Sequence, residues 1–249
     1  MRRITGLRAA VLLLLSLCAV RAAIASPADY VISPIVEEGE REIDIKAGTA
    51  KLRGGGRENS ESFGLGAGVN SWWFTEVYAI WHKTPGESNS FDAWEWENRF
   101  QLTETGEYPV DVGVLFEIER PQDRREGYEY RWGALLQSDL TTELQANLNL
   151  LIEKRIRAKQ GGKAELGYQA QLKYRLQPTF EFGVQAFGDV GGWNDWEPAD
   201  EQPHGIGPAA FGRVKLGDKL MLRYNAAALF GLTNGSARNT LRLQLEFEF

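Results

Sequence analysis

The most regular feature of the chain after residue 40 is an alternation of apolar and polar residues. In segment 110–119 the even positions are all apolar, whereas the odd positions are mostly acidic. Segments 143–155 and 164–176 show the same split between apolar and polar positions. Because successive side chains of a β-strand point to opposite faces, each segment is predicted to be a strand with one apolar and one polar face.

About twelve strands of this kind are predicted. We expect them near residues 41–51, 61–70, 74–83, 91–103, 108–119, 127–139, 143–155, 164–176, 179–189, 207–216, 220–230 and 240–249. Most exceed the roughly five or six residues usual in soluble sheets and suit the roughly 9–11 residues of a membrane-crossing strand. The predicted connections alternate strictly between short and longer, which is typical of barrels with short periplasmic turns and longer extracellular loops.

The predicted fold class is therefore all-β, a transmembrane antiparallel up-and-down β-barrel over residues 41–249. A soluble secreted β-sandwich is the alternative, since its strands would also alternate. Its connections, however, need not alternate in length. The barrel explains both features of the sequence.

The first 25 residues have the features of a secretory signal peptide. A positive segment is followed by a short apolar run and by the small-x-small sequence Ala23-Ile24-Ala25, and the run is too short to cross a bilayer. We expect cleavage after Ala25, and a retained anchor is the alternative. Cys18 is the only cysteine, so the mature chain carries no thiol chemistry. Residues 26–40 are predicted to be a flexible periplasmic lead-in.

The carboxyl end carries the strongest local pattern. Leu243, Leu245, Phe247 and Phe249 alternate with polar residues, and the last residue is aromatic. This motif resembles the C-terminal strand that the barrel-assembly machinery recognises. With the signal peptide and the strands, the chain resembles proteobacterial outer-membrane β-barrel proteins of a porin- or transporter-like kind, without an assigned subfamily. The resemblance implies a bacterial outer-membrane location, with membrane lipid and that machinery as partners.

The charged residues indicate which face of each strand points to the lumen and which to lipid. A Lys or Arg facing lipid at the bilayer midplane costs about 2–4 kcal/mol, so the charged faces are predicted to line the lumen. The candidate pore-lining residues are Glu76, Glu95, Glu97, Arg99, Asp111, Glu117, Glu119, Arg131, Lys173, Arg175, Arg213, Lys215 and Arg223. The formal net charge of the whole chain is −6, and no basic patch is present, so we expect no nucleic-acid partner.

These charges are unevenly distributed along the chain. The predicted third to fifth strands carry mostly acids, whereas the eighth, tenth and eleventh carry mostly bases. Facing arcs of opposite charge would place a transverse field across a water-filled pore, which would orient polar solutes. Alternatively, the arcs pair across the lumen and plug it. A lumen of about twelve strands is intermediate in width, and we favour a narrow or partly occluded channel.

The predicted function is a narrow channel or porin-like pore for small polar or charged solutes. A non-conducting structural or partner-binding barrel is the alternative, and an outer-membrane lipid-acting hydrolase is a third. The hydrolase is disfavoured because His82 and His204 are the only histidines. Outer-membrane phospholipases carry a His-x-Ser sequence, and neither histidine is followed by serine in this way. We expect no catalytic residue, metal or cofactor. Segment 190–206, with Trp193 and Trp196, is predicted to fold into the barrel mouth or cover it.

Overall fold

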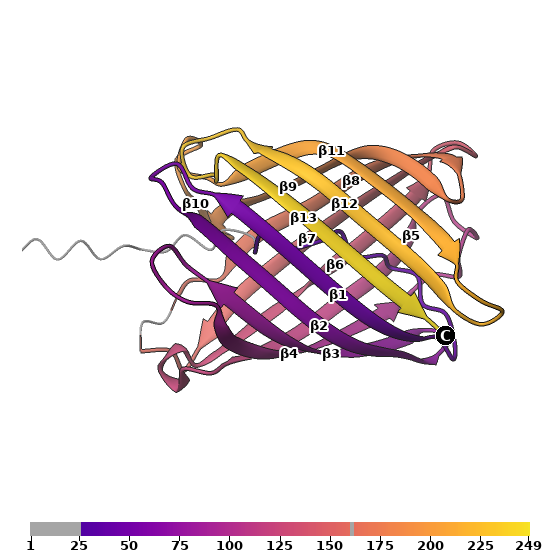
Figure 1. Ribbon diagram of the computed structural model, residues 1–249, viewed down its shortest axis with the longest axis horizontal. Helices are drawn as coiled ribbons and strands as arrows, with labels where there is room; N and C mark the ends of the chain where they lie inside the picture. Colours follow the sequence, from indigo (N-terminus) through magenta and orange to yellow (C-terminus); the bar gives the residue numbers. More distant parts are fainter. Residues whose placement is uncertain (1–25, 160–161) are drawn as a thin grey trace, which may run out of the picture.

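The computed structural model describes residues 26–159 and 162–249, in which one antiparallel sheet closes into a barrel (Figure 1). The long strands are β1 (Arg41–Lys51), β2 (Arg57–Asn70), β3 (Trp73–Lys83), β4 (Ser90–Gln101), β5 (Asp111–Pro121), β6 (Tyr128–Asp139), β7 (Leu144–Ile156), β8 (Glu165–Gln177), β9 (Phe180–Gly192), β11 (His204–Lys215), β12 (Met221–Gly231) and β13 (Asn239–Glu248). These twelve strands confirm the predicted up-and-down barrel.

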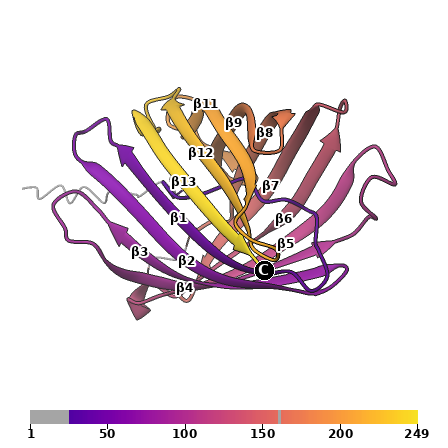
Figure 2. The same cartoon turned by 45° about the vertical axis from the view of Figure 1, so that its right-hand side comes forward.

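Two short elements complete the chain. The 3-10 helix η1 (Arg124–Glu126) lies between β5 and β6, and β10 (Asp195–Trp196) pairs only with the end of β9. The barrel closes where β13 pairs with β1, over the register from Glu42 opposite Glu248 to Lys51 opposite Asn239. Figure 2 shows the yellow β13 beside the indigo β1.

The two faces of the wall differ as the alternation predicts. Large apolar side chains are exposed on the outside, among them Phe63, Leu65, Val77, Trp94, Leu148, Leu172, Phe182 and Leu243. The alternate positions point inward and carry most of the charges. Among the described residues, no helix is long and apolar enough to cross a bilayer. An apolar exterior around a closed polar wall is the arrangement of an outer-membrane β-barrel.

One connection departs from the predicted alternation of lengths. At the short-turn end of the barrel, where β2 meets β3, residues 102–110 form a long connection because β4 stops at Gln101 and β5 begins at Asp111. Their own polar groups fold this segment: the Asp111 Oδ1 accepts a hydrogen bond of 2.7 Å from the Gly106 N–H, and Gly106 has a positive φ of 73°. The opposite end of the barrel, where β1 meets β2, is the long-loop end. Residues 1–25, the predicted signal peptide, lie outside the described residues.

Candidate functional site: the barrel lumen

The strand register places every predicted lining residue on the inward-facing positions of the wall. Their burial nevertheless differs widely. Glu76, Glu97 and Glu117 are almost completely buried, whereas Arg213 and Lys215 are exposed near the short-turn end of β11. The lumen is therefore filled at mid-height and open to solvent near this end.

Strand pairing brings the acidic residues together across β3, β4 and β5. Glu76 stands opposite Glu97, and Glu97 stands opposite Glu117 on the next strand. Two arginines lie beside two of these carboxylates. The Arg99 Nε lies 3.1 Å from a Glu97 carboxylate oxygen, and the Arg131 guanidinium donates to the Glu117 carboxylate at 2.8 Å. The acidic arc thus carries its own counter-ions.

Three bases of the basic arc also have acidic partners on the wall. The Lys173 ammonium lies 3.4 Å from the carboxylate of Glu181 on the neighbouring strand. Arg175 donates to the carboxylate of Asp139 at 2.8 Å, and Arg223 pairs with Glu248. Since each of these bases has an acid beside it on the wall, the two arcs do not plug the lumen by pairing across it.

A separate stretch of chain fills the lumen instead. Residues 26–36, here called the luminal segment, were expected in a flexible periplasmic lead-in, but they lie inside the barrel. They begin in the long-loop half, where Pro27 packs against Gly48, and leave at the short-turn end, where the Gly39 N–H donates to the Gly68 carbonyl at 3.0 Å. The expectation failed because the segment is rich in apolar side chains, which favour burial over solvent.

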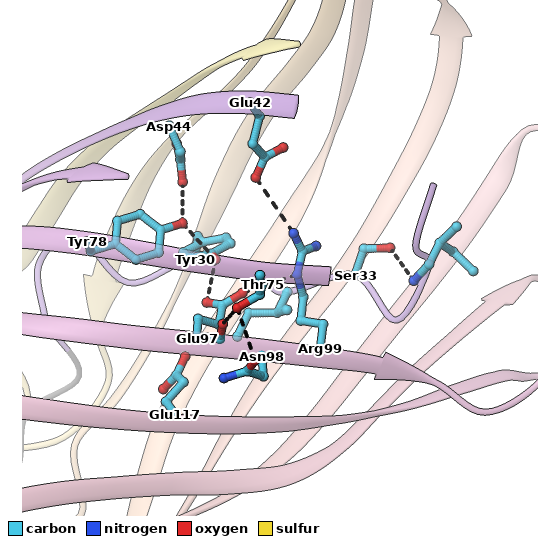
Figure 3. Close-up of polar contacts among 12 residues, drawn as sticks. Tyr30, Ser33, Glu42, Asp44, Thr75, Tyr78, Glu97, Asn98, Arg99 and Glu117 are labelled. Carbon is cyan, nitrogen blue, oxygen red and sulfur yellow. Dashed lines mark hydrogen bonds and ion pairs between the residues drawn. The ribbon is translucent and has the colours of Figure 1, made fainter. Parts of the chain in front are cut away.

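The luminal segment is held by buried polar contacts on both sides of the lumen. The Tyr30 hydroxyl donates to the Glu97 carboxylate at 3.0 Å (Figure 3). The Ile32 carbonyl accepts a 3.0 Å hydrogen bond from the Asn149 amide. The Val36 N–H donates to the Gln101 side-chain oxygen at 2.7 Å. These contacts join the segment to strands far apart around the barrel.

Apolar packing completes the closure. Tyr30, Ile32, Leu115, Leu135 and Leu151 form one buried cluster, here called the luminal core. Ile32 and Leu135 are both 0% exposed. Burying an aliphatic side chain of this size contributes about 1.5–3 kcal/mol. The luminal core therefore closes the middle of the barrel with packing of the kind found inside soluble proteins.

Three inward glycines mark where the luminal segment and the following turn touch the wall. A Cβ added at Gly48 would lie 2.1 Å from the Pro27 carbonyl oxygen, and one at Gly68 would lie 1.9 Å from the Glu37 carbonyl oxygen. At Gly113 the added Cβ would lie 3.0 Å from the Pro34 Cβ. Because any side chain at Gly48 or Gly68 would collide with main-chain atoms, these glycines allow the segment to pass.

Above the luminal core lies a water-accessible space of about 260 Å³, here called the outer cavity. The residues that line it lie in the middle of the barrel and in its long-loop half. Tyr30 and Gln169 line the side of the cavity that faces the luminal core. Nine carboxylate side chains line it, against three lysines or arginines and one histidine. The carboxylates belong to Asp29, Glu58, Asp92, Glu95, Glu117, Glu119, Glu129, Glu153 and Asp189, and the bases are Lys46, Arg131, Arg155 and His82. The outer cavity is therefore strongly acidic.

The two histidines occupy different places. His82 lines the outer cavity, and its Nε2 lies 2.8 Å from the Glu58 carboxylate. The His204 ring contacts the Tyr168 hydroxyl at 3.2 Å and the Gln202 side-chain oxygen at 3.0 Å. Ser236 bonds the main chain of His204.

Segment 190–206 was expected to fold into the barrel mouth or to cover it, and none of its residues lines the outer cavity. Its first part extends β9 and forms the hairpin with β10, where Trp193 and Trp196 are exposed. Its second part packs against the loop before β13, and the Asn234 N–H donates to the Asp200 carbonyl at 3.0 Å. The loops thus support each other beside the mouth because their main-chain groups find partners there.

Within residues 26–159 and 162–249, two groups of carboxylates have the spacing of a metal site. Glu95, Glu97 and Glu117 bring oxygens within 4.8 Å of one another, and so do Glu40, Glu42 and Glu248. Each group has a guanidinium beside it: Arg99 lies within 4.0 Å of both Glu97 and Glu42. The spacing of each group therefore reflects charged networks shared with guanidinium groups.

Comparisons with known proteins agree with this architecture. No protein-family model and no curated protein sequence matches the chain. An outer-membrane channel from Pseudomonas putida F1 is similar in structure, with a TM-score of 0.61 and 11% identity over 90% of this chain and 99% of that one. The NanC porin has a TM-score of 0.56 at 12% identity, covering 83% and 98%. The KdgM porin, solved in complex with disordered oligogalacturonate, has 0.55 at 10%, covering 84% and 98%. At these identities the likeness concerns the fold.

Proposed function

We propose that the protein is an outer-membrane channel for small cationic solutes and that its luminal segment restricts the passage. The observation that carries this proposal is the charge of the outer cavity, where nine carboxylates face three lysines or arginines. A cleft of one charge sign with low-dielectric walls focuses its field and raises the local concentration of oppositely charged solutes. The excess of carboxylates therefore attracts cations and repels anions.

The acidic outer cavity is unsuited to the passage of acidic sugars. Oligogalacturonate, which accompanies the KdgM porin in its structure, carries a carboxylate on each sugar unit. Such a polyanion would meet an excess of carboxylates, Glu119 and Glu153 among them, at the wall of the outer cavity. The ligand of that porin is therefore not carried over to this chain.

The restriction is reversible in principle because the luminal segment is not a strand of the wall. No residue of 26–36 takes part in a strand ladder. Its withdrawal breaks side-chain contacts and leaves every strand pairing of the barrel in place. Local opening of such a segment requires less free energy than unfolding the barrel.

The test is to refold residues 26–249 and record ion currents in a planar bilayer with unequal KCl concentrations on the two sides. We expect discrete current steps whose reversal potential shows a preference for K⁺ over Cl⁻, and this preference should weaken at high salt as charges are screened. A preference for Cl⁻ would contradict the proposal.

A second function is favoured by the luminal core itself. With Ile32 and Leu135 completely buried in mid-lumen, the barrel is well suited to a non-conducting structural or partner-binding role. Correctly folded protein that gives no current steps, even after the luminal core has been disrupted, would support this second function over the channel.

A further inference from the structure

The wall of the lumen holds the luminal segment as a binding site holds a peptide. The Ile32 N–H donates to the Gln169 side-chain oxygen at 3.4 Å, and the Ile32 carbonyl accepts from the Asn149 amide at 3.0 Å. These two wall side chains also bond each other at 2.8 Å. Together they present one acceptor and one donor to the main chain of a single residue.

At the position of Ile32 this pair of amides contacts the main chain, while the Gln169 Nε2 also donates to the Asp29 carboxylate at 3.0 Å. With the segment in place, Asn149 and Gln169 are 0% and 2% exposed, so the hydrogen bonds to the Ile32 main chain satisfy polar atoms that water does not reach. Any residue with a free N–H can occupy the position of Ile32. Main-chain hydrogen bonds give affinity in peptide recognition, and side-chain pockets give specificity.

The luminal core supplies such a pocket. The Ile32 side chain lies among Leu115, Leu135 and Leu151, which stand on the inward and otherwise polar faces of β5, β6 and β7. The site therefore accepts one apolar side chain at the residue whose main chain is clamped. Gln169 also lines the outer cavity, so the clamp lies directly beside the acidic space.

We infer that the lumen binds short cationic peptides with a central apolar residue, and that the luminal segment occupies their site as a tethered competitor. This inference rests on the proposed function and names its substrate class. The basic residues of such a peptide would lie among the carboxylates of the outer cavity, while its apolar residue would replace Ile32. The tethered segment competes at an effective concentration on the order of millimolar, so a free peptide binds measurably only when the segment moves aside.

A disulfide gives control over the segment. The Cβ added at Gly113 would lie 3.0 Å from the Pro34 Cβ, against about 3.5–4.5 Å in disulfides, so a small shift accommodates the bond. Residues 26–249 contain no cysteine. The double variant Pro34→Cys/Gly113→Cys is therefore locked when oxidised and free when reduced.

The experiment measures binding of a fluorescent, end-blocked Lys-Leu-Lys peptide to refolded residues 26–249 in detergent. We expect the reduced double variant to bind at least ~10-fold more tightly than the oxidised one. A Glu-Leu-Glu peptide should bind neither form. Equal binding to both forms, no binding to either, or equal binding of the acidic peptide would overturn the inference.

A second variant tests the clamp without a disulfide. Asn149→Leu removes the same contact from the luminal segment and from the peptide, so it should raise the ion current while the apparent peptide affinity, which depends on the ratio of the two, stays within about twofold. A residue that only held the segment would raise both. Asn147→Leu is the matched control, because Asn147 bonds Gln137 and Gln171 and not the segment; its ion current should stay within about twofold of the unchanged protein.

The two proposals fail separately. Cation-selective current without peptide binding would overturn the peptide site alone. Peptide binding to the reduced variant without current in any state would overturn the channel while supporting the binding site.

Discussion

The outer cavity and the luminal core are built from the same strands, yet one holds solvent-accessible space and the other is packed. Strand β5 contributes Glu119 and Glu117 to the outer cavity and Leu115 to the luminal core. The width of the barrel therefore does not explain the difference. The luminal segment runs through both regions, since residues 26–30 line the outer cavity. Where its apolar side chains meet the inward leucines the lumen is packed, and where it passes the charged wall the lumen keeps open space. A barrel of this size is closed by an added chain segment and not by its wall alone.

The largest expected effect comes from breaking the luminal core. Ile32→Asp places a carboxylate in a position that is 0% exposed, and burying an unpaired charge is strongly unfavourable. The luminal segment should leave its site, and the mean current should rise about 10-fold in planar bilayers. Ile35→Asp is the matched control, because Ile35 is only partly buried on the same segment. An unchanged current for Ile32→Asp would show that the segment does not restrict the passage.

The next effect concerns the outer cavity. Glu119→Gln with Glu153→Gln removes two of its carboxylates at nearly constant volume, so the field that favours cations weakens. The ratio of K⁺ to Cl⁻ permeability should fall about two- to fivefold, as read from the reversal potential. Glu104→Gln, in the exposed connection 102–110, should leave the ratio unaltered. If both variants changed it equally, the selectivity would not arise in the outer cavity.

A smaller effect is expected at the boundary between the two regions. Tyr30→Phe removes the hydroxyl that donates to the Glu97 carboxylate at 3.0 Å, and losing a buried hydrogen bond to a charged group costs about 1.5–3 kcal/mol. The free energy of unfolding in urea should fall by that amount. Tyr174→Phe, on the exposed outer face of β8, should change it by less than about 0.5 kcal/mol. If Tyr30→Phe lowered the free energy of unfolding no more than Tyr174→Phe does, the Tyr30 ring and not its hydroxyl would have the stabilising role.

The strands could be predicted from the sequence because lipid imposes a strict alternation on them. In β7 the apolar side chains of Leu148 and Leu150 face out, while the amides of Asn147 and Asn149 face in, and a shift of one residue would reverse every side chain. The cross-strand neighbours were not predictable. That Glu76, Glu97 and Glu117 are adjacent depends on turn geometry and on a register shift near Ile80.

The luminal segment was missed, although the sequence contains signs of it. Residues 30–36 hold five large apolar or aromatic side chains, which a flexible lead-in does not need. The inward faces of β5, β6 and β7 each carry one leucine among polar residues, namely Leu115, Leu135 and Leu151. Each sign is weak alone. Only their meeting at one height in the barrel makes them a core, and that height follows from the stagger of the strands.

The smallest expected effect lies where the luminal segment joins β1. Burial, and next the carboxylate of Glu248, raise the pKa of Glu40 from 4.5 to about 7, and the Glu40 carbonyl accepts a 2.9 Å hydrogen bond from the Gly68 N–H. Because its pKa is higher in the folded than in the unfolded state, Glu40 favours folding fully below about pH 4.5, and this contribution is lost as the pH rises through 7.

The urea midpoint of unfolding should therefore fall slightly between pH 5 and pH 8. Glu40 anchors the end of the luminal segment to the wall, so the current should rise over the same range as this anchor loosens. Glu40→Gln keeps the shape of the side chain without its titration and should remove this part of the pH dependence. Glu38→Gln, at an exposed neighbouring position, should retain it. If Glu40→Gln left the pH profile of both midpoint and current unchanged, the anchor would not respond to protonation, and the restriction would depend on the luminal core alone.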